Sequence, residues 1–85
     1  MTEERRQELR DKYPDLIELC KECKTLGYYL NEMSFAFDED ELYLFYYRAE
    51  AYLKCLIDLG KFSPVAAVEL IEKLQHYRDE FKDEV

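Results

Sequence analysis

The chain has 85 residues and a net charge of −8, so it forms one domain, near the size at which a single core gives only modest net stability. Its apolar content of 48%, with eight Tyr and five Phe, excludes disorder, and the acidic balance excludes binding of nucleic acid or an anionic membrane through a basic face. Helix-favouring residues dominate, with only two Gly and two Pro. The composition therefore predicts a single all-α domain over residues 1–85.

The first predicted helix covers residues 3–12. Thr2 is a suitable N-cap, and the acidic residues that follow it suit the positive end of the helix dipole. This helix has one clear apolar anchor, Leu9, and Tyr13-Pro14 interrupts the chain after it. We expect a short, loosely docked N-terminal helix.

A heptad pattern of apolar residues predicts the second helix over about 14–36. The seam consists of Leu16, Leu19, Cys23, Leu26, Leu30, Met33 and Phe37. Small residues beside the seam, Gly27 among them, allow a neighbouring helix to approach closely. The pattern favours one continuous helix through Gly27 at a penalty of about 1 kcal/mol, and the alternative is a helix that ends at Gly27.

The third predicted helix, about 39–59, begins at a capping-box pair, Asp38 and Glu41. It is apolar around most of its circumference, through Leu42, Leu44, Phe45, Tyr46, Ala49, Ala51, Tyr52, Leu53, Cys55, Leu56, Ile57 and Leu59. Such a helix must be covered on several sides. In so short a chain this predicts either a homodimer whose two-fold interface includes part of this helix, or a coat completed by the N-terminal helix.

Gly60 ends the third helix, and Ser63-Pro64 begins the last one, about 64–83. Its apolar stripe is formed by Ala67, Leu70, Ile71, Leu74, Tyr77 and Phe81. The short loop predicts that the last two helices form an antiparallel hairpin. The expected fold is a small helical bundle of three main helices (about 14–36, 39–59 and 64–83) plus a short N-terminal helix.

The three cysteines and the single histidine are the only residues whose types suggest a metal site. Cys20 and Cys23 fall inside the apolar seam, and His76 falls opposite the apolar stripe of its helix, so we expect no metal and interpret the cysteines, Cys55 included, as small buried apolar residues. An odd cysteine number without an N-terminal apolar run indicates a cytoplasmic protein with free thiols.

The sequence gives little support for catalysis. Carboxylate pairs such as Glu18 and Glu22 lie on polar helix faces without a cleft to shift their pKa values, and no glycine-rich phosphate loop is present. We expect a protein that is not an enzyme and that needs no cofactor.

Two tyrosines on the polar side of the third helix are the best candidate binding residues. Tyr43 and Tyr47 lie one turn apart, among Asp40, Glu50 and Lys54. Aromatic side chains are enriched at binding hot spots, because they give a large contact area with few rotamers to freeze. We therefore predict that these five residues bind a protein partner.

Two alternatives remain open at this point. The N-terminal helix could cover the two tyrosines with Leu9 and Tyr13, which would make them part of the core. The acidic segments 38–41 and 79–84 could imitate nucleic-acid phosphates for a nucleic-acid-binding target, or serve only solubility. The favoured hypothesis is a cytoplasmic, homodimeric interaction module, such as a small inhibitor or adaptor of phage or mobile-element type that binds a host macromolecule; the alternative is an acidic nucleic-acid mimic.

Overall fold

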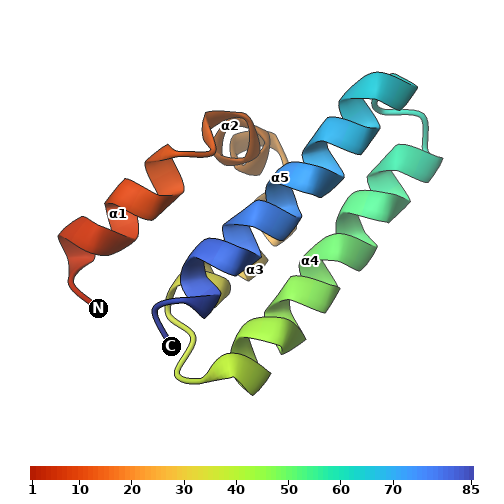
Figure 1. Ribbon diagram of the computed structural model, residues 1–85. Helices are drawn as coiled ribbons and strands as arrows, with labels where there is room; N and C mark the ends of the chain where they lie inside the picture. Colours follow the sequence, from red (N-terminus) through yellow and green to blue (C-terminus); the bar gives the residue numbers. More distant parts are fainter.

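The computed structural model describes all 85 residues and consists of five α-helices without strands. The helices are α1 (Glu3–Asp11), α2 (Pro14–Glu22), α3 (Lys24–Ser34), α4 (Glu39–Asp58) and α5 (Pro64–Lys82). Figure 1 shows α4 and α5 as a long antiparallel hairpin, with α3 packed behind it and α1 and α2 along one side. None of the helices combines the length and the apolar character that crossing a bilayer requires.

The predicted helix over 14–36 is divided in two, and this corrects both of our expectations for it. The break lies at Cys23, whose backbone (φ −111°, ψ 84°) ends α2 and begins α3. Gly27 lies inside α3. No continuous helix therefore runs from residue 14 through Gly27, and no helix ends there. A Cβ at Gly27 would lie 3.3 Å from the Cβ of Cys20, so glycine allows the close packing of α3 on α2.

The hydrophobic core draws on every helix. Its twelve buried members are Leu9, Leu16, Leu26, Leu30, Met33, Leu42, Tyr46, Ala49, Leu53, Leu74, Tyr77 and Phe81. The predicted seam is wrong at its last member, because the chain leaves helical geometry after Ser34 and Phe37 is 86% exposed. On α4, one side of the wide apolar arc remains uncovered, where Leu44, Ala51, Cys55 and Leu59 are exposed.

The predicted caps are present and fix the ends of the hairpin. The carboxylate of Asp38 accepts a hydrogen bond from the backbone N–H of Glu41 (2.9 Å), and the hydroxyl of Ser63 accepts one from that of Ala66 (3.2 Å). Gly60 follows α4 with a φ of 77°, a conformation that favours glycine. These local features set where the two helices begin and where α4 ends, and the antiparallel hairpin brings the start of α4 beside the end of α5, where Glu39 lies 3.5 Å from the Nζ of Lys82.

The N-terminal helix is docked more firmly than the sequence indicates. Leu9 is fully buried in the core. The Arg6 Nε donates to the carbonyl oxygen of Ser34 (3.0 Å), and the Arg5 Nε lies 2.8 Å from the carboxylate of Glu84. These contacts join α1 to the end of α3 and to the C-terminus.

Candidate functional site

Three tyrosines on α4 form a cluster on the hairpin. We call Tyr43, Tyr46 and Tyr47 the tyrosine cluster: its ring centroids are 6.2 Å (Tyr43–Tyr46), 5.9 Å (Tyr43–Tyr47) and 5.2 Å (Tyr46–Tyr47) apart. The helical spacing i, i+3, i+4 brings the rings to neighbouring positions. Tyr46 is buried, Tyr43 is half-buried, and Tyr47 is 59% exposed. The cluster therefore runs from the core to the surface.

Two cations from α5 lie over these rings. The guanidinium carbon of Arg78 is 4.6 Å from the centre of the Tyr46 ring and 5.5 Å from that of Tyr43. The Nζ of Lys82 is 5.7 Å from the centre of the Tyr43 ring. Cations at these distances are attracted to the negative face of an aromatic ring. The second helix of the hairpin thus holds the cluster in place.

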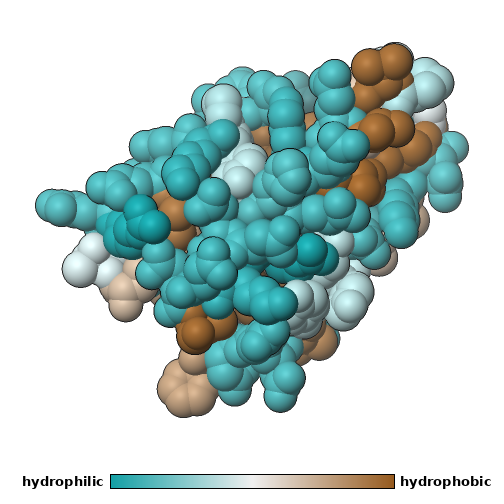
Figure 2. Space-filling model, viewed as in Figure 1, coloured by the Kyte–Doolittle hydropathy of each residue, from teal (hydrophilic) through white to brown (hydrophobic).

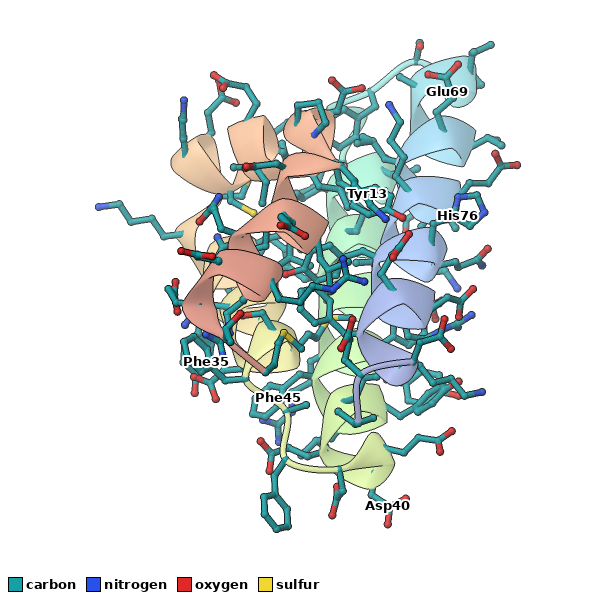
Figure 3. All side chains as sticks on the ribbon, turned by 60° about the vertical axis from the view of Figure 1, so that its left-hand side comes forward. Tyr13, Phe35, Asp40, Phe45, Glu69 and His76 are labelled. Atoms are coloured by element: carbon teal, nitrogen blue, oxygen red, sulfur yellow. The ribbon has the colours of Figure 1, made fainter.

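The N-terminal helix provides none of these cation–ring contacts. Leu9 is a member of the core, and the Tyr13 ring packs edge-on against Tyr77 of α5, with centroids 5.9 Å apart. Figure 3 labels Tyr13 at the end of α1, next to α5. The cation over Tyr43 and Tyr46 is Arg78 of α5, while Leu9 and Tyr46 belong to the same core cluster.

A polar network continues the cluster along α4. The hydroxyl of Tyr46 donates to the carboxylate of Glu50 (2.6 Å), and Glu50 lies 3.5 Å from the Nζ of Lys54. Burial, together with the Glu50 carboxylate, raises the pKa of Tyr46 to about 12. The network stiffens the base on which Tyr47 rests.

Four of the five predicted binding residues therefore belong to one connected set: Tyr43, Tyr47, Glu50 and Lys54. Asp40 is exposed in the first turn of α4, at the end labelled in Figure 3, and it is not linked to the set by a hydrogen bond or ion pair. Its neighbour Glu39 lies 3.5 Å from the Nζ of Lys82.

The sequence analysis missed Arg78, Lys82 and the part played by Tyr46. Tyr46 belongs to the predicted apolar arc, and it is buried in the structure. The predicted hairpin could have indicated which basic residues of α5 lie opposite the tyrosines of α4. A turn near residue 61 brings residues 46 and 78 to similar distances from the loop, as it does residues 43 and 82, so Arg78 lies opposite Tyr46 and Lys82 lies opposite Tyr43.

The structure does not group the candidate metal ligands. No three His, Cys, Asp or Glu side chains are arranged to hold a metal ion. Cys20 and Cys23 are half-buried against the core, but Cys55 is exposed, which corrects its interpretation as a buried apolar residue. It lies on the side of α4 that no other helix covers. His76 projects outward from α5 (Figure 3).

The candidate site is thus an exposed aromatic side chain on a fixed aromatic and charged base, without a deep cleft. Rigid aromatic side chains of this kind suit contact with another macromolecule. Comparison with protein-family models, with curated proteins and with solved structures finds no match to this chain.

Proposed function

We propose that the protein is a non-enzymatic protein–protein interaction module, which binds a protein partner through a surface centred on Tyr47. Tyr43, Glu50, Lys54 and Asp40 surround this centre on α4. One observation carries the proposal: Tyr47 is 59% exposed, yet its ring is packed against two other tyrosines. An exposed aromatic ring adds little to folding, so its support by a fixed base favours a role in binding.

The fixed base beneath Tyr47 reduces the loss of side-chain conformational entropy that binding would otherwise cause. Tyr46 is held by its hydrogen bond to Glu50 (2.6 Å) and by the Arg78 guanidinium (4.6 Å from the ring centre). Freezing a mobile side chain at an interface costs roughly 0.5–1.5 kcal/mol, and a ring that is already fixed avoids much of this. The same base presents Tyr47 in one orientation, which favours a specific partner.

A more specific version of this proposal is a small inhibitor or adaptor of the type that phages and mobile elements carry. The support is compositional: a short, acidic, aromatic-rich helical chain. It acts by occupying a surface of a host macromolecule.

A second candidate function, an acidic nucleic-acid mimic, is favoured by the arrangement of the charges. The antiparallel hairpin brings the acidic segments 38–41 and 79–84 to the same end of the molecule, where Lys82 pairs with Glu39 (3.5 Å). Carboxylates gathered at one end can imitate phosphates for the basic site of a nucleic-acid-binding protein.

Salt dependence separates the two candidates. The immobilised protein is incubated with host lysate, and each captured protein is then titrated from low to high salt. Binding through Tyr47 should change little with salt, whereas a nucleic-acid mimic should lose affinity steeply. A photo-reactive phenylalanine analogue at position 47 should crosslink the partner, and the same analogue at the exposed Tyr28 of α3 should not. Crosslinking from position 28 alone contradicts the proposal.

A further inference from the structure

The loop end of the α4–α5 hairpin exposes a group of aliphatic side chains that no segment of the chain covers. Leu59 is 73% exposed, Val65 69% and Val68 58%. Figure 2 shows hydrophobic residues gathered at this end of the hairpin, while most of the visible face is hydrophilic. We call the surface formed by these three residues and the hollows beside them the hairpin tip.

Two hollows lie on the hairpin tip. The first, of about 500 Å³, lies between α4 and α5 and is lined by Lys54, Ile57, Ala67, Val68, Ile71, Glu72 and Gln75. The second, of about 450 Å³, is lined by Pro64, Val65, Val68 and Glu69. Val68 lines both hollows, so it forms a ridge between them. The same surface therefore carries an apolar projection and apolar depressions.

The hairpin tip has a smaller acidic excess than the opposite end of the hairpin. Around the tip, Asp58, Glu69 and Glu72 are matched in number by Lys54, Lys61 and Lys73, and the carboxylates of Asp15, Glu18 and Glu22 on α2 lie nearby, where Asp15 pairs with Lys73. The opposite end holds the eight carboxylates of the acidic segments 38–41 and 79–84, with Arg5, Lys12, Arg78 and Lys82 as the nearby cations. A molecule with a net charge of −8 meets less repulsion from its own kind at the less acidic end.

We propose that the hairpin tip is the interface with a second copy of this chain, related by a two-fold axis. In such a contact, the same surface must supply both the projection and the depression, as the hairpin tip does with Val68 and the two hollows. The two α5 helices cross antiparallel near Val65 and Val68, and the ridge of each copy enters the hollow of the other. The acidic ends then point away from each other.

The charges beside the ridge fit this symmetry. Lys61 precedes Val65 by four residues and Glu72 follows Val68 by four, so both pairs share one midpoint in the sequence. Lys61 lies in the loop that precedes α5, and Glu72 lies on α5, so an antiparallel crossing at that midpoint would bring the loop of each copy, with Lys61, towards Glu72 of the other. Within the chain, both side chains are exposed and neither takes part in an ion pair.

Sedimentation equilibrium of the full chain at micromolar concentration tests the proposal. The unchanged protein should be a dimer. Val68→Asp should raise the dimer dissociation constant at least about tenfold, because it places a carboxylate in the apolar contact. Leu44→Asp is the matched control, since it puts the same charge on the uncovered side of α4, where Leu44 is 47% exposed. Circular dichroism should show unchanged helicity in both variants, whose altered residues are exposed.

Charge reversal tests the register. Lys61→Glu and Glu72→Lys should each weaken the dimer, and the double variant should restore it. A monomeric unchanged protein, or a dimer that resists Val68→Asp but is lost in Leu44→Asp, overturns the proposal. A double variant no stronger than either single one overturns the Lys61–Glu72 pairing. Tyr47 is unchanged in all of these variants, so their results can be told apart from a failure of the proposed partner surface, although Lys54 borders both surfaces.

Discussion

The guanidinium carbon of Arg78 lies 4.6 Å from the centre of the Tyr46 ring, and the Tyr47 ring lies 5.2 Å from that same ring. Arg78 belongs to α5 and the two tyrosines belong to α4, so the proposed binding surface depends on both helices of the hairpin. Changes in α5 should therefore alter how α4 presents Tyr47.

Arg78→Gln tests this coupling. The change keeps much of the side-chain stem but removes the charge over Tyr46 and Tyr43, which should lower the free energy of unfolding by about 1 kcal/mol. Arg48→Gln is a suitable control, because Arg48 is exposed and its guanidinium lies farther from a ring, 5.4 Å from that of Phe45. Urea unfolding measures both. Equal losses in the two variants would contradict a special role for Arg78.

The raised pKa of Tyr46 predicts a loss of stability at alkaline pH. The ordinary pKa of 10.0 applies to the unfolded chain, whereas burial raises the pKa to about 12 in the folded protein. The contribution of the neutral Tyr46 hydroxyl to the free energy of unfolding is therefore complete below pH 10. It is lost as the pH rises from 10 towards 12, because Tyr46 releases its proton at a lower pH in the unfolded chain than in the folded protein. Tyr46→Phe should flatten this part of the stability curve.

Tyr77 supplies the control for that experiment. Burial also raises its pKa, and its hydroxyl donates to the carbonyl oxygen of Leu30 (2.8 Å). Some alkaline loss should therefore persist in Tyr46→Phe and diminish further in the Tyr46→Phe/Tyr77→Phe variant. Chemical unfolding between pH 8 and 12 gives the slope of the free energy of unfolding against pH for each protein. Identical slopes in all three proteins would contradict the assignment of the alkaline loss to Tyr46 and Tyr77.

Leu9→Ala tests whether α1 belongs to the core. Leu9 is fully buried, so its truncation should destabilise the protein by about 2–5 kcal/mol, as large-to-small changes in cores do. Phe37→Ala, at a side chain that is 86% exposed, should change the stability by less than about 0.5 kcal/mol. Thermal unfolding measures both. A small effect of Leu9→Ala would mean that α1 is a loosely docked arm.

The cysteines should differ in reactivity. Burial raises the pKa of Cys20 to about 11, although the nearby Arg10 opposes the shift, while Cys55 is exposed. Iodoacetamide at pH 8 should therefore modify Cys55 well before Cys20, as peptide mass spectrometry would show. Cys20 reacting first would contradict its place in the structure. Denatured protein, in which every thiol is accessible, is the control.

Much of the fold follows from local sequence signals. The caps at Asp38 and Ser63 and the glycine at position 60 are short-range features, so the hairpin ends could be predicted from them. The break at Cys23 could not. The break accompanies the close packing of α3 on α2 at Gly27, and this contact between segments leaves no mark in the heptad pattern, which continues through the break.

For the candidate site too, the local sequence pattern does not reveal the contacts between helices. Helical spacing alone places Tyr43 and Tyr47 on one face, together with Glu50 and Lys54. The cations over the rings depend on the register of α5 against α4, which is a tertiary property. Exposure was also hard to predict, because an apolar arc does not reveal which side another helix covers. Leu44 and Cys55 remain exposed for this reason.

Tyr47→Ala, measured for both stability and partner binding, tests the central claim most directly. The thermal midpoint should hardly change, because the side chain is 59% exposed, while the affinity for the salt-resistant captured partner should fall by about 2 kcal/mol, roughly thirtyfold. Tyr28→Ala, at a tyrosine of α3 that is 55% exposed, should retain full affinity. A Tyr47→Ala protein that binds as tightly as the unchanged one would contradict the proposed binding surface.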